Sequence, residues 1–415
     1  MAHTNPLAGV RVLDLSRILA GPVCTQLLAD LGADVVKVER PGAGDDTRQW
    51  GPPFVDDELS AYFIACNRGK RSLALDLQHP AGRSVLDDLL RRADVMIENF
   101  LPDSLARLGL TPERLRELNP RLVSVSISAY GRTGAAAALP GYDLIIQART
   151  GLMAITGEPE GRPMKVGVAL ADVITGLYAA TSALAGLVGR SRSNDSAEQG
   201  RTFDLALADC TLASLVNIVQ STLVTGRRPQ RWGNAHPQIV PYETFATADG
   251  HIVLAVGADR QWQRLCAAVE HPEWASDPRF ITNPARVEHC AAVVERLRPL
   301  LLSRSTSAWQ ALFEQLDIPH GPVLAVDEAL TDPQFAAREM IQPVTDAAGN
   351  TYRMLGSAVH WHDEPPRAPL PVPHLGEHSR TVLGEWLEYD AARIDELVGQ
   401  GVVAESKPSS KTTTS

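Results

Sequence analysis

Residues 10–39 read VRVLDLSRILAGPVCTQLLADLGADVVKVE, and this stretch indicates the fold class. It holds two short apolar runs that are typical of strands, Val10 to Leu15 and Val35 to Glu39. Between them a Gly-Pro dipeptide opens a helical pattern over Val23 to Leu31, and a glycine follows it. Two strands joined by one helix form a β-α-β unit, which predicts parallel pairing and a right-handed crossover.

The same alternation of helix and strand continues along the chain. Helical patterns over 83–92 and 112–118 each lead into an apolar run, over 94–98 and 122–127. Repeated units of this kind predict an α/β fold with a large Rossmann-like domain, an open parallel sheet with helices on both faces. No G-x-G-x-x-G motif follows the first run, so a nicotinamide or flavin site has little support.

The second half of the chain predicts a smaller α+β domain. Two Ala/Leu-rich helical stretches, 175–188 and 204–225, come first, and the residue pattern changes after Gly226. A strand over 251–256 then follows an Asp-Gly turn, with amphipathic stretches after it. We expect four regions: the first part of the large domain over 1–225, the small domain over 226–330, a return segment to the large domain over 331–400, and a disordered tail over 401–415.

Composition limits the partners and the compartment. The net charge of -10 argues against nonspecific binding to nucleic acid or to a membrane surface. No apolar run approaches the length of a membrane span. The cysteines are dispersed, without C-x-x-C or zinc-type spacing, which predicts free thiols and no metal site. We expect a cytoplasmic protein, or a mitochondrial one if a presequence is missing from this sequence.

Asp172 is the candidate nucleophile. It lies in GVALADVITG, residues 167–176, where a strand-like run gives way to a helical pattern. At that position an aspartate is most often a helix N-cap, which is the competing interpretation. With an ordinary pKa of about 3.9 its carboxylate is ionised at neutral pH and needs no base to activate it.

Several groups suited to a large anionic ligand fall at predicted strand ends. Arg40 follows the second strand, at the edge where ligands of open α/β sheets bind. Asn67 to Arg71 is a basic cluster, Asn99 and Phe100 end a further strand, and Arg107 follows them. Each alone is more typical of a solvated surface or a core. Together they suit the phosphates, the adenine and the pantetheine arm of coenzyme A.

With these residues the sequence resembles the class III CoA-transferase family, of the formyl-CoA transferase and carnitine CoA-transferase type. The motifs that carry the resemblance extend over most of the chain: LDLSRILAGP at 13–22, KVERP at 37–41, ENF at 98–100, GYD at 141–143, ADVITG at 171–176 and GPV at 321–323. Two further stretches are similar to the succinyl-CoA:glutarate CoA-transferase branch, PGAGDDTRQWGPPF at 41–54 and RWGNAH at 231–236.

The resemblance implies roles at the matching positions. Asp172 takes the place of the catalytic nucleophile. The positions at or beside those that contact CoA are Arg40, Leu75, Gln78, Asn99, Phe100, Arg107 and Tyr142, with Asp143 as an acidic neighbour of the catalytic aspartate. The resemblance also implies that a CoA thioester is a substrate, that no cofactor is permanently bound, and that two chains form an interlocked, ring-like homodimer.

Two further residues are candidates for substrate recognition. Arg17 lies in the first strand-to-helix loop, at the same sheet edge as Arg40, where a guanidinium suits the distal carboxylate of a dicarboxylic acid. Pairing with a neighbouring acid is the alternative for Arg17. His236 lies where the family has a loop that covers the active site.

Three functions fit these residues. The first is CoA transfer from an acyl-CoA donor, such as succinyl-CoA, to a carboxylic acid such as glutarate, through aspartyl anhydride and aspartyl-CoA thioester intermediates. The second is an α-methylacyl-CoA racemase of the same superfamily, which needs two acid/base groups. Those racemases carry a histidine where this chain has Tyr142, which favours transfer. The third is a non-catalytic CoA-binding protein, against which the intact Asp172 argues.

Overall fold

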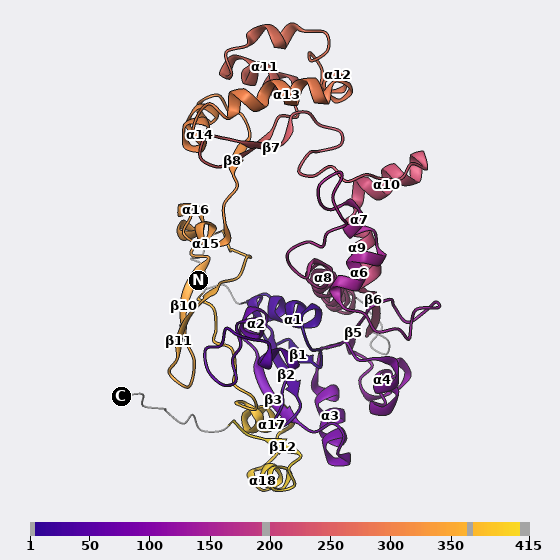
Figure 1. Ribbon diagram of the computed structural model, residues 1–415. Coiled ribbons are helices and arrows are strands. Elements are labelled where there is room, and N and C mark those ends of the chain that lie inside the picture. Colours follow the sequence, from indigo (N-terminus) through magenta and orange to yellow (C-terminus); the bar gives the residue numbers. More distant parts are fainter. Residues whose placement is uncertain (1–4, 193–199, 363–367, 407–415) are drawn as a thin grey trace. The chain divides into compact units, whose positions relative to one another are not determined.

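The computed structural model describes residues 5–192, 200–362 and 368–406, and divides the chain into two units (Figure 1). The first unit contains Met1–Leu152, Val166–Leu223 and Pro333–Ser415, and the second contains Met153–Lys165 and Val224–Asp332. The short segment Met153–Lys165 therefore leaves the first unit for the second, an excursion that the sequence analysis did not include.

The first unit is built on one seven-stranded sheet with the order β12-β3-β2-β1-β4-β5-β6. Its pairs are parallel except that β12 runs antiparallel to β3. The order 3-2-1-4-5-6 is that of the doubly wound fold, whose ligands bind where the order reverses, between β1 and β4. The strands are β1 (Arg11–Asp14), β2 (Asp34–Glu39), β3 (Arg71–Leu75), β4 (Val95–Glu98), β5 (Val123–Ser128), β6 (Arg201–Ala206) and β12 (Val403–Ala404).

Helices cover both faces because successive strand residues point to opposite sides of the sheet. On β1, Leu13 packs in one buried cluster with α3, α17 and α18, and Val12 packs in another with α1 and α8. The helices of this unit are α1 (Ala20–Asp30), η1 (Asp46–Gln49), α2 (Ala61–Ala65), α3 (Pro80–Arg92), α4 (Pro102–Leu108), α5 (Pro112–Leu118), α6 (Asp143–Arg149), α8 (Leu170–Arg192), α9 (Leu207–Ser214), α10 (Val216–Thr225), α16 (Pro333–Ala337), α17 (Ser379–Leu387) and α18 (Ala391–Gly399). A hairpin of β10 (Ile341–Thr345) and β11 (Thr351–Leu355) completes it.

Two expectations for this unit are wrong. The helix expected over 204–225 begins only at Leu207, because residues 201–206 pair with β5 as strand β6, and it breaks at Leu215. The tail expected over 401–415 is ordered at its start. Val403 and Ala404 form β12, since their backbone groups find partners on β3. Residues 407–415 lie outside the described part of the chain.

The second unit has a three-stranded antiparallel sheet, β7-β8-β9, with its own buried core. This core includes Trp262, Phe280, Trp309 and Phe313. The strands are β7 (Tyr242–Ala246), β8 (His251–Ala255) and β9 (His320–Pro322). The helices are α7 (Leu152–Ile155), which joins the two units, and α11 (Asp259–Ala268), η2 (Pro272–Ser276), α12 (Asn283–Glu288), α13 (Cys290–Leu301), α14 (Thr306–Gln315) and α15 (Val326–Ala329).

Helix α8 corrects the expectation that no apolar run reaches the length of a membrane span. With 23 residues it is long and apolar enough by length and composition, as are α9 and α10 if the bent pair is counted together. A core helix passes the same test, and α8 packs on α1 and β5 through residues such as Ala179 and Ala183. Packing within the sheet unit therefore explains the apolar character of the buried part of α8, which is 39% of its apolar window.

Candidate active site

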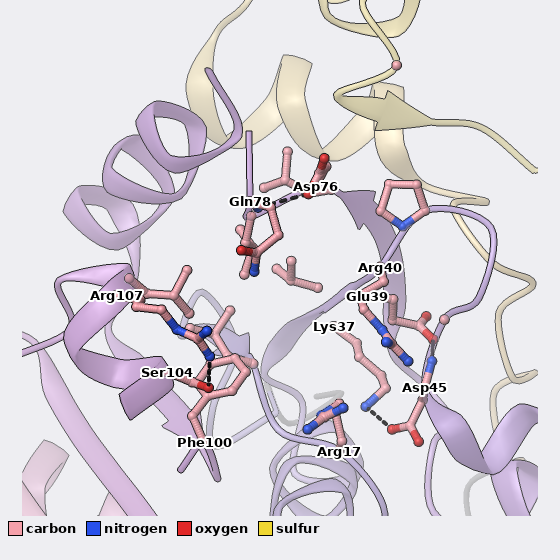
Figure 2. A pocket seen from close by; sticks show the side chains of 18 residues that line it. Arg17, Lys37, Glu39, Arg40, Asp45, Asp76, Gln78, Phe100, Ser104 and Arg107 are labelled. Atoms are coloured by element: carbon pink, nitrogen blue, oxygen red, sulfur yellow. Dashed lines mark hydrogen bonds and ion pairs between the residues drawn. The ribbon is translucent and has the colours of Figure 1, made fainter. Parts of the chain in front are cut away.

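A pocket of about 420 Å³ lies at the carboxyl ends of the strands of the first unit (Figure 2). Its walls come from the segments that follow β1, β2, β3 and β4, which the parallel sheet brings to one edge. Six of the residues singled out from the sequence line it: Arg17, Arg40, Leu75, Gln78, Phe100 and Arg107. This volume suits a portion of a ligand as large as CoA.

Three arginines line this pocket together with the buried Lys37, and their guanidinium groups differ in their partners. Arg40 and Arg17 both contact Asp46, at 2.7 and 3.3 Å. Arg107 donates to the Ser104 hydroxyl at 3.0 Å and has no carboxylate partner among the described residues (Figure 2). Arg17 therefore pairs with a neighbouring acid, as in the alternative interpretation, and that acid is Asp46.

The loop that carries Arg17 is held from both sides. The Asn99 side chain accepts from the Arg17 backbone N–H at 2.9 Å and donates to the Arg17 carbonyl at 2.8 Å. This exchange joins the ends of β1 and β4 across the switch point. The next residue, Ile18, has φ of 71°, a conformation that is costly for a β-branched side chain. Asn99 thus fixes a strained loop, and its amide is turned to the loop backbone, away from the pocket lining.

A buried polar network lies beneath the same loop. Lys37 donates to the Ser16 carbonyl at 2.9 Å and pairs with Asp45 at 2.9 Å, with both side chains fully buried (Figure 2). Burial alone would lower the pKa of Lys37, but Asp45 and then Asp14 outweigh it and raise that pKa. Asp14 in turn pairs with Lys70 at 3.0 Å. Buried charges persist only when paired in this way, so the network fixes the loops around the pocket.

Asp172 lies in the first turn of α8, in the same unit as the pocket. Burial, and then the charge of Asp143, raise the pKa of its carboxyl to about 7, although a hydrogen bond from the Ala20 backbone N–H acts in the opposite direction. The expectation of an ordinary, fully ionised aspartate is therefore wrong. At neutral pH the group is divided between its two protonation states.

Ala20 connects Asp172 to the pocket. It is the first residue of α1 and follows Arg17 by three positions, so the strained loop runs from the pocket wall to the carboxylate. The amino end of a helix carries partial positive charge and unpaired N–H groups. These groups suit an oxyanion that develops on or near the aspartyl carbonyl.

Asp143 and Tyr142 lie at the start of α6 and outside the pocket lining. One oxygen of Asp143 accepts from the Ala171 N–H at 2.8 Å, and the other accepts from Gln147 at 2.7 Å. Asp143 therefore anchors the start of α8 and acts on Asp172 through its charge. The Tyr142 side chain is 64% exposed, which leaves it free to meet a ligand or a second chain.

His236 belongs to the second unit, whereas Asp172 belongs to the first. Its backbone N–H donates to the Tyr242 carbonyl at 2.9 Å, and its ring lies edge-on to that of Tyr242, with 5.3 Å between the ring centres. Nearby, Arg231 donates to carbonyls of residues 154–161, so the excursion Met153–Lys165 is tied to this stretch.

Tyr62 and the Lys37–Asp45 pair were not among the site residues predicted from the sequence. Burial, and then the charge of Asp172, raise the pKa of Tyr62 to about 12, so its phenol is neutral and within electrostatic reach of the candidate nucleophile. Its ring lies edge-on to Trp50 at 5.1 Å. The signal for the pair was Lys37, a lysine between two valines of a strand, because a buried lysine needs a buried acid.

The strand order and the position of the pocket define a Rossmann-like α/β protein. The protein-family model described as CoA-transferase family III matches residues 7–379. The chain belongs to this family.

Its relatives match over most of their length. A succinate–glutarate CoA-transferase of Agrobacterium fabrum is 45% identical over 390 residues, covering 92% of this chain and 95% of the relative. The succinyl-CoA:glutarate CoA-transferase of Homo sapiens is 38% identical, covering 97% of this chain and 91% of the relative. The crystal structure of a CAIB/BAIF family protein from Brucella suis has a TM-score of 0.80 at 41% identity, covering 92% of this chain and all (100%) of that one.

Proposed function

We propose that this protein transfers CoA from succinyl-CoA to glutarate or a closely related dicarboxylic acid, with Asp172 as the nucleophile. The observation that carries the proposal is Asp172 itself: a largely buried carboxylate with a pKa of about 7, hydrogen-bonded to the amino end of α1. The names of the relatives support the acid pair. Arg107, which has no carboxylate partner in the described part of the chain, and Arg40 would hold the CoA phosphates.

The reaction proceeds by two exchanges on the aspartyl group. The Asp172 carboxylate attacks the succinyl thioester, giving a succinyl-aspartyl anhydride and CoA thiolate. The thiolate attacks the aspartyl carbonyl, forming aspartyl-CoA thioester and releasing succinate. Glutarate then attacks this thioester, freeing CoA thiolate and forming a glutaryl-aspartyl anhydride. The thiolate attacks the glutaryl carbonyl, which releases glutaryl-CoA and restores Asp172. The Ala20 N–H is placed to stabilise charge on the aspartyl oxygen.

A second set of residues would recognise the dicarboxylic acid. The sequence analysis gave Arg17 and His236 this role, but Arg17 lines the same pocket as Arg40 and shares a carboxylate with it. We therefore assign Arg17 to the phosphate-binding set and keep His236 as a candidate for the distal carboxylate. A site that pairs this carboxylate should strongly reject a monocarboxylic acid of similar length.

The test is a transfer assay with succinyl-CoA and a panel of acids, read by mass spectrometry. We expect glutarate to be preferred over butyrate and valerate, and a covalent adduct to form on Asp172. Asp172→Ala should fold and lose transfer. Transfer near the wild-type rate in Asp172→Ala would refute the mechanism. Equal efficiency with glutarate and valerate would refute the dicarboxylate assignment alone.

We also propose a homodimer as the working state. Large apolar side chains are exposed on α8 and on the α9–α10 pair, including Leu177, Val216 and Leu223. Such positions are typical of surfaces that a second chain covers. Light scattering on the purified protein tests this. We further place the protein in the cytoplasm, because all five cysteines are free thiols that suit a reducing compartment. We also propose that no cofactor is permanently bound, because the proposed reaction uses only the Asp172 carboxylate, the CoA thioester and the acceptor acid.

A further inference from the structure

Asp46 lies between two of the cationic side chains that line the pocket. One carboxylate oxygen contacts the Arg40 guanidinium at 2.7 Å, and the other contacts Arg17 at 3.3 Å. The carboxylate thus occupies, on both arginines, donors that a phosphate would use. We infer that Asp46 is an internal counter-anion, which competes with the phosphates of CoA for Arg17 and Arg40 and so sets the affinity for the coenzyme.

The backbone around Asp46 is fixed, so that its side chain is the part able to move. Asp46 begins the short helix η1, and Asp45 before it accepts from the Thr47 N–H at 3.0 Å. Asp45 is itself paired with the buried Lys37. On the other side of this turn the Gly44 N–H donates to the Arg40 carbonyl at 2.9 Å. The turn therefore presents the carboxylate to the arginines without being part of the buried network.

The exposure of the three side chains makes the competition reversible. Arg17 and Asp46 are each 42% exposed and Arg40 is 60% exposed. Ion pairs at such positions are weak, because water screens them and side-chain entropy opposes them. A ligand with several phosphate charges can therefore displace the carboxylate by rotation of its side chain, and the carboxylate can return when the ligand leaves.

The hydrogen bonds of the Arg17 side chain are incomplete. Its Nε atom is buried and has no hydrogen-bond partner among the described residues. A buried donor without an acceptor is costly, and a ligand oxygen would remove that cost. The contact with Asp46 uses a different atom, Nη1. Arg17 can thus gain an acceptor from a phosphate that Asp46 does not provide.

This inference rests on the proposed use of CoA, and it predicts a gain of function. Asp46→Asn keeps the shape of the side chain and removes the charge. We expect the variant to bind CoA roughly three- to tenfold more tightly than the wild type, mainly through slower dissociation. The gain should shrink as salt is raised to about 0.5 M, where charges are screened within a few ångströms. Calorimetry with CoA and stopped-flow dissociation measure both effects.

The controls separate charge at the pocket from other effects. Asp46→Glu keeps the charge and should bind CoA as the wild type does. Asp57→Asn removes the same charge from an exposed position in the loop that follows η1 and should also change nothing. Pantetheine, which has no phosphate, should bind Asp46→Asn and wild type equally.

Three results would overturn the inference. They are unchanged or weaker CoA binding by Asp46→Asn, an equal gain for pantetheine, and a gain for glutarate without one for CoA. The last of these would place Arg17 and Asp46 at the acyl end. If the wild type itself binds no CoA, the proposed function is wrong. This result differs from the three above, so a failure of the proposed function can be distinguished from a failure of the inference about Asp46.

Discussion

Asp172 and Asp143 form a pair of acids whose properties are coupled. The Asp143 carboxylate accepts hydrogen bonds from the Ala171 N–H and the Gln147 side chain, so it is held close to the start of α8. Its charge is the second cause, after burial, of the raised pKa of Asp172. In the proposed mechanism only the ionised Asp172 attacks a thioester, so kcat/KM should rise with pH through about 7.

Asp143→Asn should therefore shift the acid limb of the pH profile. Removing the like charge lowers the pKa of Asp172, so more of it is ionised at pH 6, and kcat/KM there should rise roughly two- to threefold relative to its plateau. The profile of kcat/KM from about pH 5 to 9 measures this. Asp209→Asn removes an exposed carboxylate from the first turn of α9 and serves as the control. An unshifted profile in Asp143→Asn would mean that burial alone sets the pKa.

Helix α8 approaches α1 closely, and this contact positions Asp172. At Gly176, one turn after Asp172, an added Cβ would meet the Ala20 carbonyl at 2.7 Å and the Val23 side chain at 3.0 Å. The glycine thus lets the two helices come close enough for the Ala20 N–H to reach the carboxylate. A glycine in a helix ordinarily lowers stability, so its presence here has a packing reason.

Gly176→Ala should lower both stability and turnover. The added methyl group must push α8 away from backbone, which should reduce the melting temperature by several degrees and kcat by roughly tenfold or more. Gly189→Ala on the same helix is the matched control, because a Cβ there meets nothing within 4 Å. It should be neutral or stabilising by up to about 1 kcal/mol. Equal behaviour of the two variants in thermal melts and assays would contradict the role of the close approach.

At the scale of the whole molecule, the chain forms two units with separate cores. The first is assembled from three stretches of sequence, and the second from two. In the second unit Trp309 is 2% exposed, stacks on Phe313 at 5.2 Å and donates from its indole to the Leu301 carbonyl at 2.8 Å. None of these groups lines the pocket, so we expect that the stability of the second unit can change without loss of the proposed CoA site.

Trp309→Ala should destabilise the second unit by about 3–5 kcal/mol, the usual result of removing a buried tryptophan. In scanning calorimetry the transition of the second unit should move to lower temperature. The transition whose temperature is raised by saturating CoA should stay in place. Trp274→Ala is the control, because Trp274 is only partly buried and stacks on His271. A single transition that responds to both the mutation and CoA would show that the units unfold together.

The sequence predicted most of the sheet unit for a local reason. Strand and helix periodicity over residues 10–39 reflects contacts between near neighbours, so the β-α-β unit and the placing of Arg40 at a strand end could be inferred directly. The same reasoning failed for β6 and β12, which are strands only because β5 and β3 supply their partners. Pairing with a distant strand leaves little trace in local composition.

The sequence by itself determined the α/β class, the cationic strand ends and Asp172 at the start of a helix. Only the tertiary structure decided that Asn99 holds the Arg17 loop, that Asp46 bridges Arg17 and Arg40, and that burial beside Asp143 raises the pKa of Asp172 to about 7. The physical reason is the range of the forces. Backbone periodicity is local, whereas charge pairing and desolvation depend on which distant residues the fold brings within a few ångströms.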